Sequence, residues 1–183
     1  LYDKKLNKLF QCKIRNYQDW ITLRQVYFNE DYRIDQLSRS DDILKFYKHL
    51  KETGQTPLIV DCGANIGLSA LYFLGEFPES KIVAIEISKE NCHQILENVK
   101  SNRTVSVLQN AVACRADRYQ FVDPALGENG FRAVASEDGD LLGVTIDSIV
   151  EANSEYTPFV IKIDIEGGES DLFSQNIDWL EKF

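Results

Sequence analysis

The feature that most constrains the fold of this chain is a glycine turn placed directly after an apolar run. Residues 59–67 read Ile-Val-Asp-Cys-Gly-Ala-Asn-Ile-Gly, and a second apolar run, residues 82–85, ends in Glu86, 19 residues after Gly67. Glycines tolerate positive φ angles and let a backbone approach a ligand closely. An acid at the tip of the second strand accepts hydrogen bonds from ribose hydroxyls. The pattern therefore predicts two neighbouring strands that hold a nucleoside at their tips.

Apolar runs and amphipathic segments alternate after this turn. We predict strands at 58–61, 82–86, 105–109 and 159–163, and helices at 67–75, 89–99, 147–152 and from Leu172 to Leu180. Strands that are apolar almost throughout are typical of parallel sheets with helices on both faces. The predicted fold class is therefore α/β, with a doubly wound, mostly parallel sheet. An open sheet of this kind would continue after Phe183, so we expect its C-terminal strands to be missing from this chain.

The N-terminal part of the chain has a different pattern. Its apolar residues recur at helical spacing, for instance at Trp20, Leu23 and Tyr27. We therefore predict a helical cap over residues 1–56, ahead of a domain formed by residues 57–183. Aromatic residues of this cap, Tyr32 among them, either belong to the core or form a lid over a ligand pocket.

Residues 111–146 interrupt the alternation of strands and helices. Short strands are expected at 119–122 and 143–146, with a segment rich in glycine and polar residues between them. Asp147 is expected to cap the helix that follows. We interpret the whole segment as an irregular β-excursion from the main sheet.

Charge and hydropathy argue against two classes of partner. The net charge is −9, and it divides into +3 for residues 1–50 and −12 for residues 51–183. Such an acidic main body disfavours binding to nucleic acid and to anionic lipid surfaces. No stretch is apolar enough to span a bilayer, and no signal peptide is visible. We therefore expect neither nucleic acid nor a membrane as a partner.

The cysteines argue against a zinc site. No two of them have the Cys-x-x-Cys spacing that structural zinc sites use; they are Cys12, Cys62, Cys92 and Cys114. Free cysteines at wide spacing suit the reducing cytoplasm, which is where we expect the protein to act.

The glycine turn distinguishes between classes of nucleotide ligand. Dinucleotide-binding turns have the form Gly-x-Gly-x-x-Gly, and their second glycine makes room for a pyrophosphate. Here that position is Asn65, because the turn reads Gly63-Ala-Asn-Ile-Gly67. A side chain at this point suits a ligand without phosphates, such as S-adenosylmethionine. The alternative, a strand–turn–helix unit with no ligand, leaves the placement of Glu86 unexplained.

Several further motifs occur together with this turn. In chain order they are Asp61-Cys-Gly-Ala-Asn-Ile-Gly67, Glu86, Gln109-Asn-Ala-Val112, Val144-Thr-Ile-Asp147 and Lys162-Ile-Asp-Ile-Glu-Gly-Gly-Glu169. From about Pro57 to its end the chain resembles the FkbM-type methyltransferases, which are S-adenosylmethionine-dependent enzymes of the class I, Rossmann-like fold. The last motif is the part specific to this family. The chain departs from the family pattern at Cys62, where valine is common, and at Gly168, where alanine is common.

The resemblance implies which residues would bind the cofactor. Ordered from its methionine end to its adenine, they would be Asp61, Gly63 and Ala64, then Asn65 and Gly67 shaping the turn, Glu86 at the ribose, Ile87 packed on the adenine, and Asn110 and Ala111 at the adenine edge. Asp164 would face the sulfonium and the acceptor. The resemblance further implies transfer of a methyl group to a hydroxyl of a small metabolite or sugar.

Methyl transfer from a sulfonium depends mostly on in-line positioning, but an oxygen nucleophile usually also needs a general base. The candidates are Asp164, Glu166 and Glu169, with Lys162 on the same side of its strand as Asp164. A Lys162–Asp164 pair would keep that carboxylate ionised. In the alternative interpretation, Lys162 and Glu169 only anchor the turn into the last helix. We predict no metal site, because Asp164 and Glu166 do not make a full set of oxygen ligands.

Two functions from other classes remain open. The first is a non-catalytic module of the same fold, which would bind S-adenosylmethionine or its product without turning over any acceptor. The second is a nicotinamide-dependent oxidoreductase, which Asn65 argues against.

Overall fold

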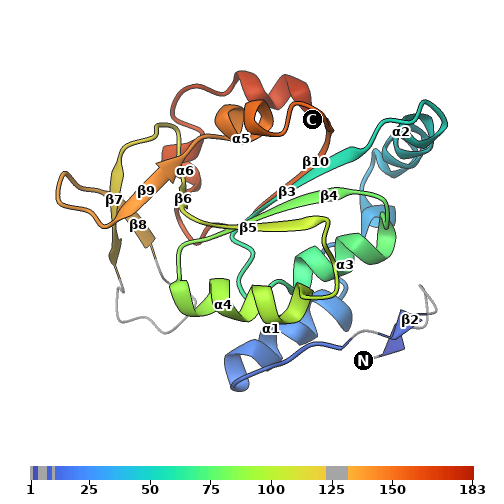
Figure 1. Ribbon diagram of the computed structural model, residues 1–183, viewed down its shortest axis with the longest axis horizontal. Helices are drawn as coiled ribbons and strands as arrows, with labels where there is room; N and C mark the ends of the chain where they lie inside the picture. Colours follow the sequence, from blue (N-terminus) through green and yellow to red (C-terminus); the bar gives the residue numbers. More distant parts are fainter. Residues whose placement is uncertain (1, 4–7, 10, 123–131) are drawn as a thin grey trace.

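The computed structural model describes residues 2–3, 8–9, 11–122 and 132–183, and its centre is a four-stranded parallel sheet (Figure 1). The strand order is β10 (Thr157–Ile163), β3 (Pro57–Cys62), β4 (Lys81–Glu86) and β5 (Val105–Gln109). Each neighbouring pair is parallel. The predicted α/β architecture with a mostly parallel sheet is therefore confirmed.

The order of these strands produces a switch point. From β3 the chain runs through α3 (Leu68–Glu76) to β4 and through α4 (Lys89–Val99) to β5, whereas β10 returns to the opposite edge of β3. In open α/β sheets, ligands bind outside the carboxyl ends of the strands at such a reversal. The carboxyl ends of β3, β4 and β10 are therefore where a site is expected.

Helices cover both faces of the sheet, as Figure 1 shows. On one face α1 (Tyr17–Tyr27), α2 (Ser40–Glu52), α3 and α4 pack around residues such as Ile59 and Ile82. On the other face α5 (Ile146–Ala152), α6 (Glu169–Leu172) and the 3-10 helix η2 (Asp178–Lys182) pack around Val60 and Val83. Alternate residues of a strand point to opposite faces, so a sheet covered twice needs apolar residues at every position.

The β-excursion forms a second, small sheet. Its strand order is β6 (Ala111–Val112), β9 (Leu141–Val144), β7 (Arg118–Val122) and β8 (Arg132–Ala135). Only the β6–β9 pair is parallel. The strand predicted at 143–146 ends at Val144, and Thr145 caps α5 through its hydroxyl, so the predicted cap at Asp147 was wrong. Residues 123–131 of the excursion lie outside the described residues.

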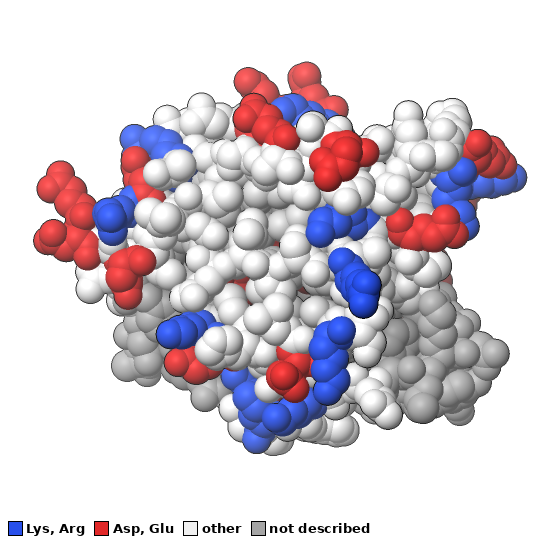
Figure 2. Space-filling model, viewed as in Figure 1, with Lys and Arg blue, Asp and Glu red and all other residues white. Residues whose placement is uncertain are grey.

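The surface of this second sheet is acidic at one end. On the face drawn in Figure 2, Asp and Glu side chains project at the left edge, which Figure 1 shows to be the end of the molecule formed by β7, β8 and β9. Uncharged side chains fill the centre of the same face (Figure 2). The excursion thus extends the molecule sideways from the central sheet and presents charge at its tip.

The N-terminal part is less helical than its spacing suggests. Strands β1 (Tyr2–Asp3) and β2 (Lys8–Leu9) pair with each other, and the short 3-10 helix η1 (Ile34–Gln36) lies between α1 and α2. Trp20, which the spacing placed on the inner face of α1, is 43% exposed and packs against Phe28, whereas Leu23 and Val26 are buried. The division of the chain at residue 56 stays a prediction.

The last predicted helix is broken into two short pieces. After α6 the chain leaves helical geometry, and Asn176 has a positive φ of 54° with its side-chain amide donating to the Cys114 carbonyl oxygen. This bond ties the segment to a backbone group 62 residues away in the sequence. Leu172 and Trp179 are buried on either side of the break. In the part of the chain that is described, no helix has the length and apolar character needed to cross a bilayer.

Candidate functional site

A cavity of about 330 Å³ opens at the carboxyl ends of β3, β4 and β10. This volume falls in the range of small-molecule sites. Ten of the predicted site residues line it, namely Gly63, Ala64, Asn65, Glu86, Ile87, Asn110, Ala111, Lys162, Asp164 and Glu166. The other three, Asp61, Gly67 and Glu169, do not. The switch point and the cavity therefore coincide.

Glu86 lines this cavity at the end of β4. Its side chain is almost buried, at 8% exposure, and its two oxygens accept the backbone N–H groups of Asn65 and Ser88, each at 2.9 Å. Burial raises the pKa of Glu86, against the lowering effect of these hydrogen bonds. A carboxylate has about four lone-pair sites, so two further donors can bind here. The two neighbouring hydroxyls of a ribose are donors of this kind, and the site therefore fits a nucleoside.

The glycine turn is shaped by contact with the neighbouring strand end. Gly63 has a φ of +75°, and a Cβ atom there would lie 1.9 Å from the carbonyl oxygen of Asp164. The N–H groups of Gly63 and Ala64 both donate to the Ile85 carbonyl oxygen at 2.9 Å. The first glycine is thus required for the close approach of the β3 and β10 ends, in addition to any approach of a ligand.

A buried ion pair joins Lys162, which lines the cavity, to Asp61, which does not. Asp61 is fully buried, accepts the Ser69 hydroxyl at 2.6 Å, and has its second oxygen 3.1 Å from Lys162 Nζ. Lys162 Nζ also donates to the carbonyl oxygens of Cys62 and Gly63, at 3.3 and 2.6 Å. The predicted partner of Lys162, Asp164, is 3.9 Å away. Lys162 therefore serves chiefly to neutralise Asp61 and to join β10 to β3.

Asp164 is the most accessible member of this group. Its side chain is 54% exposed, and one of its oxygens accepts the Tyr32 hydroxyl at 3.0 Å. Glu166 lies beside it, and burial together with the charges of Asp164 and Glu169 raises the pKa of Glu166. Glu169 accepts the Ile165 N–H at 3.2 Å and so holds the turn at the end of β10. Among the three candidate bases, the cavity thus exposes Asp164 and Glu166.

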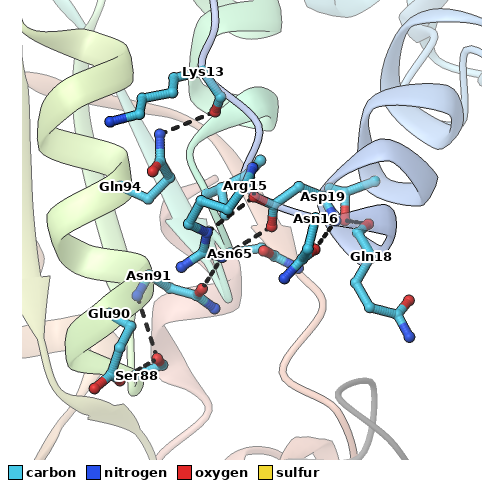
Figure 3. A network of polar contacts seen from close by, with 12 residues as sticks. Lys13, Arg15, Asn16, Gln18, Asp19, Asn65, Ser88, Glu90, Asn91 and Gln94 are labelled. Atoms are coloured by element: carbon cyan, nitrogen blue, oxygen red, sulfur yellow. Dashed lines mark hydrogen bonds and ion pairs between the residues drawn. The ribbon is translucent and has the colours of Figure 1, made fainter.

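The N-terminal segment completes the walls of the cavity. Figure 3 shows Arg15 reaching between Asp19 and Asn91 near the glycine turn. Its guanidinium donates to both carboxylate oxygens of Asp19 at 2.9 Å and to Asn91 Oδ1 at 2.8 Å. Asn91, which follows the Ser88 cap of α4, lines the cavity, as do residues of α1 and of the segment after it.

Several lining residues were absent from the sequence prediction; they are Thr22, Gln25, Asp31, Ser69, Asn91, Tyr119 and Asp171. Tyr32, for which the sequence left a core and a lid position open, also lines the cavity. Ser69 and Asn91 stand two to three residues from a predicted site residue or cap, so proximity in sequence could have suggested them. The residues from α1 and the segment after it belong to no recognisable motif, and only tertiary packing brings them to the cavity.

Comparison with known proteins shows which family this chain matches. The family model for the methyltransferase FkbM domain matches residues 61–183. The hexuronic acid methyltransferase AglP of Haloferax volcanii is 26% identical to this chain over 161 residues, which are 86% of this chain and 64% of that protein. The chain thus spans less than two thirds of the length of this curated relative.

Proposed function

This chain belongs to the FkbM methyltransferase family, and we propose that it uses S-adenosylmethionine to methylate a hydroxyl group of an uncharged small molecule. The observation that carries the proposal is Glu86, a nearly buried carboxylate that lines the cavity at the tip of the second strand. When bound, the cofactor supplies a methyl group already activated on a sulfonium. The protein then has to bind the cofactor and the acceptor, orient them, and remove the proton of the acceptor hydroxyl.

The lining residues divide these tasks. Glu86 accepts the ribose hydroxyls, while Ile87, Asn110 and Ala111 form the adenine side of the cavity. Asn110 is held there because its amide donates to the Leu142 carbonyl oxygen at 3.0 Å. Asp61 does not line the cavity but forms an ion pair with Lys162, which does.

Deprotonation of the acceptor is assigned to the carboxylates that follow β10. Asp164 accepts the proton that the acceptor hydroxyl loses, because it directly follows β10 and its exposed carboxylate lines the cavity. Glu166, the adjacent acid, has a raised pKa and is the second candidate for this task. Most of the remaining rate enhancement comes from holding the reactants in line.

The Glu86→Ala variant should bind S-adenosylhomocysteine about 100-fold more weakly than the wild type, because two hydrogen bonds to a charged acceptor are lost. Isothermal titration calorimetry measures this directly. Glu90→Ala is the matched control, since Glu90 lies nearby on α4 but does not line the cavity. Equal affinity of Glu86→Ala and wild type would contradict the proposed ribose contact.

The affinity measured in the same titration should depend on pH. Burial raises the pKa of Glu86 above 4.5, and ribose hydroxyls bond to its ionised form. Wild-type affinity should therefore be full above the raised pKa and fall as the pH drops through it. Binding that stays constant down to pH values near the ordinary glutamate range would assign the contact to another group.

The charge of the cavity favours a neutral acceptor. Five carboxylates line it, those of Asp31, Glu86, Asp164, Glu166 and Asp171. Among the described lining residues the one cationic side chain is Lys162, whose charge is opposed by Asp61 at 3.1 Å. A carboxylate on the acceptor would meet net repulsion of about 1 kcal/mol or more from each close acid.

Neutral hexosides should therefore be better acceptors than the matching hexuronosides, by about tenfold or more in kcat/KM. Methyl glucopyranoside and methyl glucopyranosiduronate form one matched pair, because they differ only at C6. Transfer of labelled methyl groups to such pairs, with added salt as a control for screening, measures the ratio. Faster methylation of the uronosides would overturn the neutral-acceptor proposal, and cofactor binding without transfer to any member of the panel would favour a non-catalytic module.

A further inference from the structure

We propose that Tyr32 is a positioning residue for Asp164, holding one carboxylate oxygen so that the other remains available to an acceptor hydroxyl. This inference rests on the proposed function, in which Asp164 takes the proton. Tyr32 lies in the segment between α1 and η1, about 130 residues away from Asp164 in sequence, and its hydroxyl donates to Asp164 Oδ2 at 3.0 Å. It belongs to none of the motifs that the chain shares with its family.

Lys162 cannot perform this task in the observed arrangement. An ammonium group has three donors, and Lys162 Nζ directs its contacts to the carbonyl oxygens of Cys62 and Gly63 and to the buried Asp61. At 3.9 Å from Asp164 Oδ2 it is beyond hydrogen-bond distance. Of the described residues, Tyr32 is therefore the one whose side chain donates to the Asp164 carboxylate.

The ring of Tyr32 makes two further contacts. It packs against Phe73, with ring centroids 6.1 Å apart, and Lys162 Nζ lies 5.5 Å from its centroid. Burial and then the charge of Asp164 raise the pKa of Tyr32 well above its ordinary value, so the hydroxyl keeps its proton and acts as the donor.

The segment that carries Tyr32 is a turn joined by two ion pairs. Glu30 adopts a positive φ of 57°, and the Arg33 guanidinium bonds to Glu30 at 2.6 Å and to both oxygens of Asp35 at 2.6 and 2.7 Å. Ile34, the next residue along, is buried in the main core. The turn therefore positions the Tyr32 hydroxyl next to Asp164, just after β10.

Fixing Asp164 matters because its side chain is half exposed. An exposed aspartate samples several rotamers, and each acceptor encounter would then have to select the reactive one. A single donor anchored in the core removes this freedom while leaving the second oxygen without a described protein donor.

The first test measures the rotamer of Asp164 without any ligand. Three-bond couplings from its Cγ to the backbone nitrogen and carbonyl carbon report χ1, and we expect a single rotamer in the wild type and averaged couplings in Tyr32→Phe. Tyr47→Phe is the matched control, because it removes a hydroxyl from an aromatic cluster of Phe77 and Phe159 that does not line the cavity. Unchanged Asp164 couplings in Tyr32→Phe would overturn the inference.

The second test measures catalysis on the neutral hexoside that the wild type methylates fastest. Tyr32→Phe should lower kcat about tenfold or more, while KM for the cofactor changes less than about twofold. In an Asp164→Ala background, which removes both side-chain oxygens, the same substitution should change kcat less than about twofold, because the carboxylate that Tyr32 would hold is gone. Equal fractional losses in both backgrounds would mean that Tyr32 does not act through Asp164.

Calorimetry with S-adenosylhomocysteine separates this inference from the proposed function. Unchanged affinity in Tyr32→Phe is expected, since Glu86 and the adenine wall are untouched. If the wild type itself bound no S-adenosylhomocysteine, the proposed function would fail, and the rotamer couplings would still decide the Tyr32–Asp164 contact independently.

Discussion

Lys162→Met should lower the free energy of unfolding by about 3–5 kcal/mol, the cost of leaving one partner of a buried ion pair uncompensated. Asp61 is fully buried and Lys162 is 8% exposed, so water cannot solvate the Asp61 carboxylate once its partner is removed. The Gly63 carbonyl oxygen also loses its donor at 2.6 Å. Urea-induced unfolding followed by circular dichroism measures the change.

A second variant identifies the charge on Asp61 as the cause. In Lys162→Met combined with Asp61→Asn the site is neutral, so the double variant should recover at least about half of the loss. The Ser69 hydroxyl can still donate to the side-chain oxygen that remains at position 61 in that variant. If the single variant lay within about 1 kcal/mol of the wild type, Asp61 would have to be neutral or rehydrated in the folded protein.

Gly63→Ala should destabilise the fold by about 2–5 kcal/mol, the sum of a left-handed backbone and of overpacking. The added Cβ would lie 1.9 Å from the carbonyl oxygen and 2.8 Å from the carbonyl carbon of Asp164. Both are backbone atoms at the end of β10, so relief requires the two strand ends to separate. The loss is again measured by urea-induced unfolding.

Gly54 provides a control with the same backbone geometry and no contact. Its φ is +72°, against +75° for Gly63, and an added Cβ would meet nothing within 4 Å. Gly54→Ala should therefore cost only the backbone part, about 1–2 kcal/mol. Equal losses for the two variants would show that the close approach of β3 and β10 contributes nothing to stability.

The central sheet could be predicted because its signals are local. The β3 strand is apolar over consecutive residues, Gly63 follows it directly, and the next strand ends in Glu86. Strand, turn and acid each depend on residues within one segment. The same holds for α4, whose Ser88 cap is visible in the sequence.

The parts that could not be predicted depend on distant contacts. The break after α6 follows from Asn176 bonding to Cys114, a residue 62 positions away. Trp20 has the spacing of a core residue, yet Leu23 and Val26 take the inner face of α1. Tyr32 reaches the cavity only because the turn before η1 carries it there, and no local pattern marks a residue as a partner of Asp164.

The pairing of β10 with β3 also has a consequence for how the site forms. The two sides of the cavity come from segments about 100 residues apart, as the contact between Lys162 and Gly63 illustrates. Closing a loop of that length is slow compared with local structure formation, so the cavity is among the last features that folding can complete. A ligand that touches both Glu86 and Asp164 then bridges the two segments that this loop brings together, and the free energy of unfolding rises with its concentration.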